Sequence, residues 1–179
     1  MLHVIRNSVT GAENAFEFAP PPLPADYRYT DALDPWEATG LIRGHYPEPD
    51  CTVSQWVDEI DHQESFGSTI AEVGVFHASA SREQLVGMAR LVFRKDHGEL
   101  DSLVVHTDHR GQRLGRSLIE YRLRLAEMLG VQSLYMPFIE AGQESYNPYM
   151  NFYLDAGFSR NAQGEFRFGP QAGPLFAAQ

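Results

Sequence analysis

A segment rich in glycine and arginine follows an apolar stretch near the middle of the chain. Apolar residues 103–105 lead through a polar turn into a helical pattern that opens with Arg-Gly-x-x-x-Gly. The first turn of a helix leaves backbone N–H groups without intrahelical partners, and the aligned peptide dipoles add partial positive charge there. Glycine lets a ligand approach the backbone, and arginine adds permanent charge. The pattern predicts a pyrophosphate seat formed by Arg110, Gly111, Gln112, Arg113, Leu114, Gly115 and Arg116.

The same pattern has other interpretations. Glycines at this spacing often only permit close packing or end a turn. A transmembrane dimer motif is excluded because arginines surround the glycines. A Walker P-loop would need Gly-Lys-Ser/Thr, which does not follow, and the dinucleotide-binding fingerprint is also missing. His106 and His109 flank the turn, but no second ligand has suitable spacing, so we expect no metal.

Two carboxylates and a tyrosine are candidates for proton transfer. Strand alternation would place Glu99 and Asp101 on the same face as Leu103 and Val105. Each carboxylate could instead be a polar residue near a strand start, paired or solvated. Tyr153 has a simpler interpretation as an amphipathic aromatic, with its ring in the core and its hydroxyl at the surface.

The hydrophobic pattern outlines the elements that must position these residues. Aromatic residues predict a strand at 27–30, and Asp34 followed by Pro35 predicts a capped helix to about residue 45. Apolar residues at helical spacing after Thr52 predict a second helix at 53–62. An antiparallel meander is then expected from strands at 68–76, 85–95 and 99–106.

A long helix and a parallel strand complete the predicted core. Apolar residues keep helical period over 113–129, and Gly130 ends that helix. The strand at 131–138 follows a helix, so the right-handed crossover makes it parallel to its predecessor and the sheet mixed. A short helix (147–156) that stops at Gly157 and closing strands (158 and 165–168) follow.

The amino-acid composition is typical of one globular domain and argues against a nucleic-acid partner. The chain has 179 residues, of which 43% are hydrophobic and 21% charged, values that fit a single domain. Acidic residues outnumber Lys and Arg 24 to 14, whereas phosphate-backbone binding needs a basic surplus. We expect an N-terminal arm (1–25) that is rich in proline, a main domain (26–169), and a C-terminal tail (170–179) that is either loose or a homodimer contact.

The single cysteine and the lack of long apolar runs bear on location. Cys51 has no partner for an intramolecular disulfide, which fits a reducing compartment. Residues 1–7 contain no apolar core of signal-peptide length, and no run of 18 apolar residues occurs. We therefore expect a cytoplasmic protein without a membrane segment.

Two blocks of the sequence carry a family resemblance. The first joins apolar residues 103–105 to Arg-Gly-Gln-Arg-Leu-Gly at 110–115, and the second ends in Phe-Tyr-x-x-x-Gly-Phe at 152–158. Over residues 26–169 they resemble the GNAT superfamily of acyl-coenzyme A dependent acyltransferases, although Arg113 stands where the family has a glycine. The resemblance implies an α/β (α+β) fold, a mixed and mostly antiparallel central sheet with helices on both faces, and N-acetyltransferase activity with acetyl-CoA as cosubstrate.

The resemblance also implies roles for individual residues. Amides of residues 111–116 would hold the pyrophosphate, with the Arg113 side chain turned outward, and the cofactor would also contact Leu103, Val104, Val105, Asn147 and Tyr153. The backbone of residues 103–105 would pair with the pantetheine arm. Tyr153 would protonate the departing sulfur, with Tyr149 and Tyr146 as fallback donors. Asp101 or Glu99 would accept the amine proton, and Asp101 is favoured because it lies further into the sheet.

The acceptor is left open by the sequence. The resemblance implies direct transfer to a primary amine of a small molecule or peptide, without a covalent enzyme intermediate. Glu140 and Glu144 follow a strand where the substrate groove would open, and they could select a cationic acceptor or belong to a solvated loop. Two further hypotheses keep the same helix start: a non-catalytic sensor that binds acyl-CoA, and a nucleotide-binding protein for which ATP would compete with coenzyme A.

Overall fold

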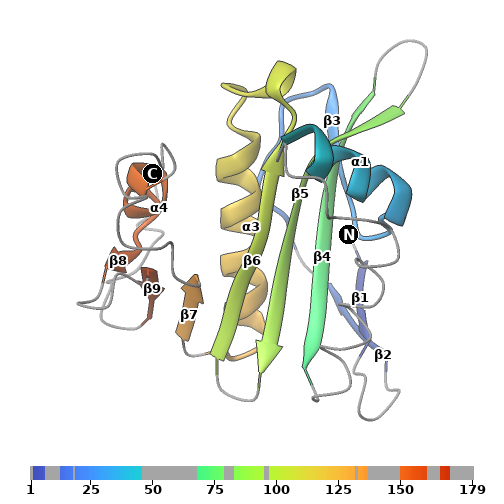
Figure 1. Cartoon of the computed structure of the whole chain (residues 1–179). Coiled ribbons are helices and arrows are strands. Elements are labelled where there is room, and N and C mark those ends of the chain that lie inside the picture. The colour runs from blue at the N-terminus through green and yellow to red at the C-terminus, as the bar shows by residue number, and fades with distance from the viewer. Residues whose placement is uncertain are drawn as a thin grey trace.

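A single mixed sheet forms the centre of the computed structural model (Figure 1). The structure describes residues 2–6, 13–17, 19–45, 68–78, 83–94, 97–131, 133–136, 150–160 and 166–169. Within them, the sheet has seven strands in the order β3-β4-β5-β6-β7-β9-β8. These are β3 (Tyr27–Thr30), β4 (Thr69–Ala78), β5 (Glu83–Arg94), β6 (His97–Val105), β7 (Ser133–Met136), β8 (Ser159–Arg160) and β9 (Phe166–Phe168). Neighbours are antiparallel except β6 and β7, so the predicted mixed, mostly antiparallel sheet is confirmed.

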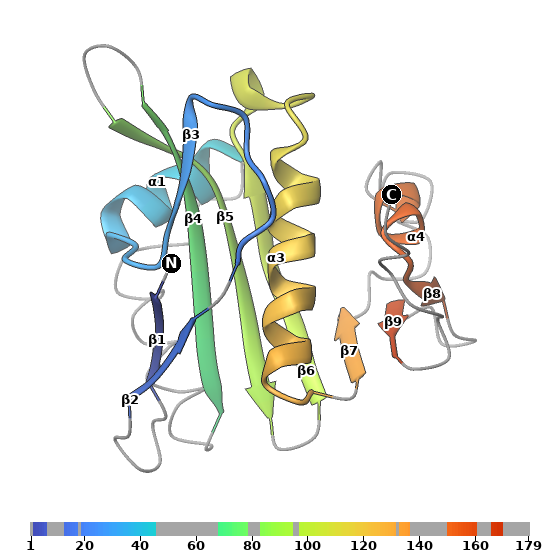
Figure 2. The ribbon, with the colours of Figure 1, turned by 180° about the vertical axis from the view of Figure 1, so that it is seen from behind.

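Helices cover both faces of the sheet, as the sequence predicts. Figure 1 shows α1 (Pro35–His45) in front of the strands, and Figure 2 shows α3 (Leu114–Met128) on the opposite face. The larger core lies on the α3 side, where Leu118 is buried with Val75 and Leu91. The smaller core lies under α1 and includes Met88 and Val104. The 3-10 turn η1 (Thr107–His109) precedes α3, and the short helix α4 (Met150–Asp155) follows β7.

Short-range sequence signals set the helix ends at the predicted places. Oδ1 of Asp34 accepts hydrogen bonds from the backbone N–H groups of Trp36 (2.8 Å) and Glu37 (3.1 Å), which caps α1. Gly130 after α3 and Gly157 after α4 have φ angles of +71° and +93°. Glycine adopts this left-handed conformation without steric cost, so both helices end where the glycines stand.

A bulge interrupts the pairing of β6 with β5. Ala89 pairs with Leu103, whereas Leu91 pairs with Leu100. Two residues of β6 therefore stand opposite the single residue Arg90 on β5. An extra residue of this kind bends the strand and reverses the alternation of its side chains.

The bulge overturns the predicted alternation along β6. Leu100, before the bulge, belongs to the α3 core, and Val104, after it, belongs to the α1 core. The side chains of Glu99 and Asp101 consequently lie on the α1 face, opposite those of Leu103 and Val105. The prediction that these four side chains share one face is wrong, because alternation holds only where each residue has one partner across the ladder.

The N-terminal region contains a hairpin that the sequence did not predict. β1 (Leu2–Arg6) and β2 (Glu13–Glu17) pair antiparallel in a separate two-stranded sheet. The proline-rich stretch that follows contains no helix or strand over residues 19–24 and lies along α3. There, Ser117 Oγ donates to the Pro22 carbonyl (3.3 Å) and Arg124 Nη1 donates to the Ala19 carbonyl (3.2 Å).

Several predicted features lie outside the residues that the structure describes. These are the helix at 53–62, Cys51, Glu140, Glu144, Tyr146, Asn147, Tyr149 and the tail at 170–179. Among the described helices, none combines the length and the apolar character needed to cross a membrane.

Candidate active site

The start of α3 has a backbone geometry that suits an anion. Gly111 and Arg113 have φ angles of +76° and +62°, and α3 then begins at Leu114 without a side-chain cap. The Ser117 N–H donates to the Arg113 carbonyl at 3.0 Å. The N–H groups of residues 114–116 precede this bond and point out of the helix end, where peptide dipoles favour negative charge.

The arginines of this turn have different surroundings. Arg113 is exposed, as the resemblance implies. Arg110 Nε donates to the Val105 carbonyl at 3.3 Å, so this side chain folds back over the end of β6. Arg116 forms an ion pair with Glu120 one turn later, with Nε and Oε1 separated by 2.9 Å. The turn therefore carries three guanidinium groups at the surface, two of which are held by neighbours.

The two glycines of the turn have different roles. Apart from its chain neighbours, a Cβ placed on Gly111 would meet no atom of the described residues within 4 Å, and the positive φ is the feature that favours glycine there. A Cβ on Gly115 would lie 3.2 Å from Cζ of Phe152 in α4. This contact shows that Gly115 also lets α3 and α4 pack closely. Access of a phosphate to the backbone at Gly115 stays a prediction.

Among the described residues, the outer edge of β6 is paired only at its beginning. There β7 pairs with residues 97–99 of β6. The His106 N–H donates to the Val86 carbonyl at 2.8 Å. Alternate residues of an antiparallel strand point their N–H and C=O groups toward the same neighbour, so those of Val104 also point toward β5. The N–H and C=O groups of Leu103 and Val105 then face the edge that β7 does not reach. An extended ligand with amide groups can pair with this edge as an additional strand does.

Tyr153 lies on α4 with its side chain buried. It is 5% exposed, and its ring packs edge-on against Phe152 (5.7 Å) and Phe158 (5.6 Å between centroids). The Phe158 N–H donates to the Tyr153 carbonyl at 3.0 Å, as expected when a helix ends at a left-handed glycine. The Phe-Tyr-x-x-x-Gly-Phe block thus fixes the position of the phenol through a helix cap and a ring cluster.

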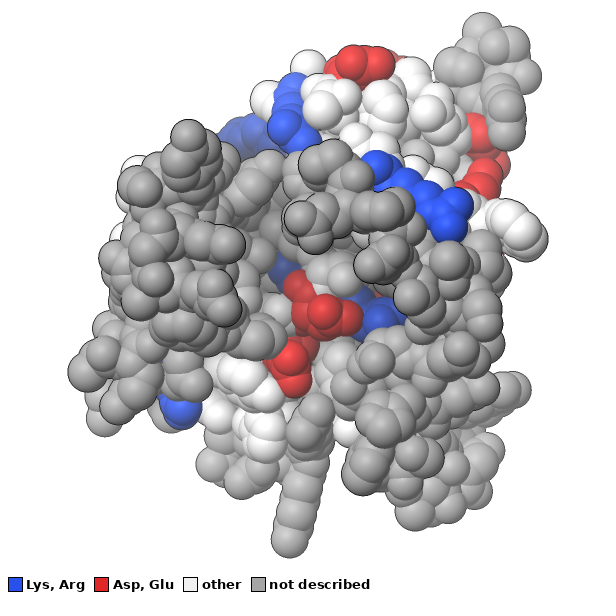
Figure 3. All heavy atoms as spheres, viewed as in Figure 1, with Lys and Arg blue, Asp and Glu red and all other residues white. Residues whose placement is uncertain are grey.

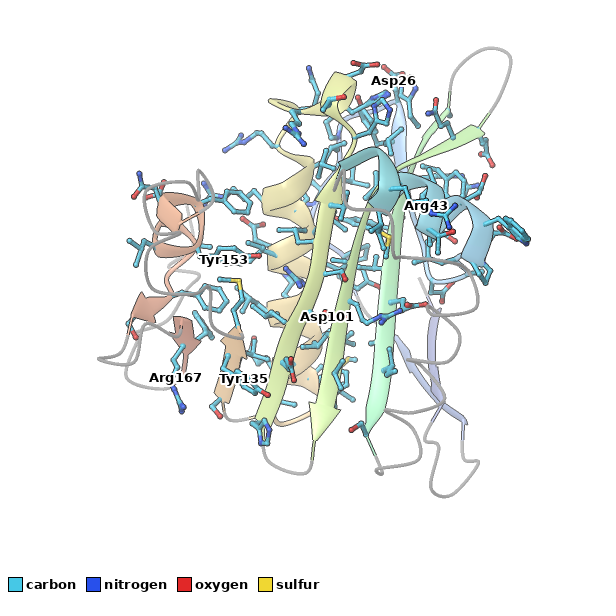
Figure 4. The ribbon with its side chains drawn as sticks, in the orientation of Figure 1. Asp26, Arg43, Asp101, Tyr135, Tyr153 and Arg167 are labelled. Atoms are coloured by element: carbon cyan, nitrogen blue, oxygen red, sulfur yellow. The ribbon has the colours of Figure 1, made fainter. Side chains whose placement is uncertain are left out.

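Asp101 belongs to an ion-pair chain on the α1 face of the sheet. Its Oδ2 lies 3.3 Å from Nη1 of Arg90, whose Nη2 lies 2.9 Å from Oε1 of Glu72. Partial burial raises the pKa of Asp101, Arg90 opposes this shift, and the neighbouring Glu99 adds to it. Burial likewise raises the pKa of Glu72. Figure 4 places Asp101 at the middle of the sheet, where Figure 3 shows acidic atoms beside basic ones.

Glu99 is bound differently from Asp101. Its Oε2 accepts a hydrogen bond of 2.8 Å from the hydroxyl of Tyr135 on β7. Glu99 and Tyr135 are also register partners in the parallel pairing of β6 and β7. The carboxylate of Glu99 therefore lies where the two strands still join, whereas Asp101 lies beyond that point.

Sequence reasoning missed Glu72, Arg90, Tyr135 and Arg122. Arg90 and Arg122 are almost completely buried, at 3% and 1% exposure. A signal for both was present, because Arg90 interrupts the apolar run of β5 and Arg122 follows Leu118 by four residues on the apolar face of α3. Buried charges of this kind require partners, and those partners come from other strands.

The histidines near the turn pack together. His109 Nδ1 lies 3.1 Å from the Tyr27 hydroxyl, and the rings of His109 and His77 are 4.8 Å apart. His106 Nδ1 accepts a hydrogen bond from the Asp108 N–H. Burial lowers the pKa of His109, as do its histidine neighbours. Among the described residues, no group of three His, Cys, Asp or Glu side chains is arranged to hold a metal ion.

Comparison with known proteins places this geometry in context. The sequence profile of the Acetyltransferase (GNAT) family matches residues 30–158, which is more than half of the chain. A search of curated protein sequences gave no significant match.

Solved structures of several acetyltransferases are similar to this chain. One, from Desulfovibrio desulfuricans and assigned to the GNAT family, has a TM-score of 0.61 at 17% identity, covering 80% of this chain and 97% of that one. The PaiA N-acetyltransferase from Thermoplasma acidophilum, in complex with coenzyme A, has a TM-score of 0.55 at 14% identity, covering 79% and 96%. The ribosomal-protein-S18-alanine N-acetyltransferase from Escherichia coli has a TM-score of 0.55 at 13% identity, covering 79% and 90%. At these identities the similarity concerns the fold.

Proposed function

Because the chain belongs to the GNAT family of acetyltransferases and is therefore an acyltransferase, we propose that it moves an acetyl group from acetyl-CoA to a primary amine by direct attack. The acceptor amine belongs to a small molecule or a peptide. One observation carries the proposal: the uncapped start of α3 lies beside an edge of β6 that β7 leaves unpaired. The helix start suits a diphosphate, and the strand edge suits an extended arm that contains amides.

Coenzyme A has the chemical groups that this arrangement can bind. Its diphosphate would accept hydrogen bonds from the N–H groups of residues 111–116, and the exposed Arg113 adds charge nearby. The two amides of its pantetheine arm would pair with the outward N–H and C=O groups of Leu103 and with the N–H of Val105, whose carbonyl accepts a hydrogen bond from Arg110. The similar fold of the Thermoplasma acidophilum protein, which was solved with coenzyme A, supports this placement.

The transfer consists of one substitution at the thioester carbonyl. The amine nitrogen bonds to the carbonyl carbon, the C–S bond breaks, and the sulfur leaves with the electron pair. Asp101 accepts the proton of the amine, directly or through water, and the Tyr153 hydroxyl gives a proton to the sulfur. A backbone N–H on β6 polarises the carbonyl oxygen, an interaction worth about 3 kcal/mol in comparable sites.

Asp101 suits the role of base better than Glu99. Its side chain is 40% exposed and lies beyond the point where β6 and β7 separate, so an amine can reach it. Its raised pKa also makes it a better proton acceptor than an ordinary aspartate, once it is ionised. The carboxylate of Glu99 is already engaged by the Tyr135 hydroxyl.

Calorimetry with coenzyme A and a thiol-release assay with acetyl-CoA test the proposal together. The acceptor panel contains free amino acids, a polyamine, an aminoglycoside and a peptide with a free N-terminus. We expect heat from coenzyme A binding and thiol release with at least one amine. No heat at millimolar coenzyme A contradicts the proposed seat. Binding without transfer to any amine favours a non-catalytic acyl-CoA sensor.

A further inference from the structure

Arg122 carries a buried positive charge and takes no part in the proton transfers assigned to Asp101 and Tyr153. It lies in α3 and is 1% exposed, which makes it the largest side chain among those fully buried in the described residues. An arginine side chain remains protonated even when burial lowers its pKa. Burying such a charge is costly, so its position requires specific compensation.

Part of the compensation comes from the bulge between β5 and β6. Nη1 of Arg122 donates to the carbonyl of Arg90 at 3.2 Å and to the carbonyl of Ser102 at 3.4 Å. These carbonyls belong to the two strands on either side of the bulge. A bulge disrupts ladder hydrogen bonds, so a donor that reaches both strands holds the distorted backbone in one conformation.

The charge of Arg122 also interacts with the two groups assigned to proton transfer. Nε and Nη2 of Arg122 donate to no carbonyl group of the described residues. Attraction to Tyr153, which includes a hydrogen bond to its side chain, and then attraction to Asp101 favour the charged form of Arg122. The cation is thus in electrostatic contact with the base on β6 and the acid on α4, two elements that are far apart in the sequence.

We infer that Arg122 is a positioning residue for acetyl transfer: it holds the β6 bulge and supplies a fixed positive charge beside both Asp101 and Tyr153. The inference rests on the proposed function for its catalytic meaning. Its backbone contacts set the direction of the N–H groups of β6 just after the bulge, where the thioester would lie. Its charge stabilises the carboxylate form of Asp101 against burial and against the neighbouring Glu99.

Two variants separate the charge of Arg122 from its backbone contacts. Arg122→Gln keeps an N–H donor for a carbonyl and removes the charge, whereas Arg122→Lys keeps the charge and loses the planar fork. Leu118→Ala is the control, since Leu118 is a fully buried core residue one turn earlier in α3. Circular dichroism establishes that each variant is folded.

Carbon-13 NMR follows the titration of the Asp101 carboxyl. The midpoint of this titration reports the influence of the Arg122 charge even when the protein transfers no acetyl group. The other charged groups near it are Arg90, Glu72 and Glu99, and none of the variants alters these. We expect Arg122→Gln to raise the Asp101 midpoint by about one pH unit, as loss of a close opposite charge does. Leu118→Ala should leave the midpoint in place. An equal shift in Arg122→Gln and Leu118→Ala overturns the electrostatic part.

Kinetics test the positioning part. We expect Arg122→Lys to lower kcat about tenfold, with a smaller change in KM for acetyl-CoA, because distortion of the bulge misplaces the reacting groups. A kcat within twofold of the parent protein, or a loss no greater than that of Leu118→Ala, overturns it. If Arg122→Gln does not fold, the comparison of Arg122→Lys with Leu118→Ala still decides. If the parent protein transfers to no amine, the proposed function fails while the NMR titration still tests the charge.

Discussion

The surroundings of Asp101 give its carboxyl a pKa that differs from that of an ordinary aspartate. An isolated aspartate has a pKa of about 3.9, and partial burial together with Glu99 raises that of Asp101 against the pull of Arg90. A base acts only when it is ionised, so activity must fall as the pH drops through this raised pKa. The acidic limb of the rate profile is therefore expected above the range of an ordinary aspartate.

The first prediction concerns Asp101→Asn. Loss of the base should lower kcat/KM at least 100-fold, within the range typical of general base catalysis, and remove the acidic limb. Thiol release measured against pH with saturating acetyl-CoA checks this. Glu99→Gln is the comparison, and its effect should be several-fold at most because Glu99 is bound by Tyr135. The reverse order of effects would transfer the role of base to Glu99.

A second prediction at the residue scale concerns the phenol of Tyr153. Tyr153→Phe keeps the ring between Phe152 and Phe158 but removes a hydroxyl that favours the buried Arg122 cation, so stability should fall modestly. The kcat should fall about 100-fold through loss of the proton donor. Turnover with saturating acetyl-CoA and thermal unfolding measure the two effects. Tyr135→Phe removes a hydroxyl from β7 as a control and should keep most of the activity. An undiminished rate in Tyr153→Phe would exclude Tyr153 from the mechanism.

At the scale of elements, helix ends position the proposed chemistry. α4 stops at Gly157 in the left-handed conformation, and Phe158 then returns to pack on Tyr153. α3 starts after Arg113, which adopts a similar conformation although it carries a side chain. A left-handed residue other than glycine costs roughly 1–2 kcal/mol, so this strain is part of the turn. The backbone of the turn, rather than the side chain of Arg113, is the proposed anion binder.

Glycine-to-alanine changes just after α4 and inside α1 should have opposite effects on the free energy of unfolding. Gly157→Ala forces a Cβ into the left-handed region and should destabilise the fold by about 1–2 kcal/mol. Gly40→Ala lies inside α1, where the new Cβ would meet no atom of the described residues within 4 Å apart from its chain neighbours and the backbone of its own helix, and it should stabilise by about 0.5–1 kcal/mol. Chemical denaturation of both variants measures the difference. Destabilisation of similar size at both sites would contradict the assigned role of Gly157.

Arg113→Gly tests whether backbone or side chain holds the diphosphate. The change relieves the left-handed strain and restores the family's glycine, so the dissociation constant of coenzyme A should change less than about fivefold, as expected for loss of one exposed charge. Calorimetry at fixed ionic strength measures it. A loss of two orders of magnitude would show that the Arg113 guanidinium is the main contact.

At the scale of the whole molecule, the separation of β6 from β7 leaves an opening that both faces of the sheet border. α3 packs on one face and α1 on the other, so each side of the sheet has its own core. Tyr153 belongs to the core on the α3 side, and Figure 4 shows it between α4 and α3, with Asp101 on the strands. The opening between β6 and β7 is the place where groups from both faces can act on one substrate. The N-terminal segment along α3 adds contacts to the same helix.

The fifth prediction concerns coupling of the ligand to the whole fold. A ligand that binds the start of α3 and the edge of β6 stabilises only the folded state, by about 2.7 kcal/mol at a concentration 100 times its dissociation constant. Coenzyme A should therefore raise the melting temperature in a concentration-dependent manner. ATP lacks the pantetheine arm and should have a smaller effect at the same concentration. An equal shift with ATP would support a nucleotide site instead.

Sequence by itself determined the helices α1, α3 and α4, the main strands and the two blocks that identify the family. Asp34, Gly130 and Gly157 act on backbone groups a few residues away, so their effect is visible in the linear sequence. The parallel orientation of β7 relative to β6 followed in the same way from chain connectivity. The predicted helix start at the glycine and arginine turn also has its physical basis within one short segment.

Only the tertiary structure decided which face of β6 each carboxylate occupies and what surrounds it. The bulge opposite Arg90 arises from pairing between two strands, and no local pattern in β6 announces it. The same is true of Arg122, whose carbonyl partners on Arg90 and Ser102 lie 32 and 20 residues away. Local hydrogen bonds and hydrophobic period are encoded over a few residues, whereas compensation of a buried charge depends on which distant groups the fold brings into contact.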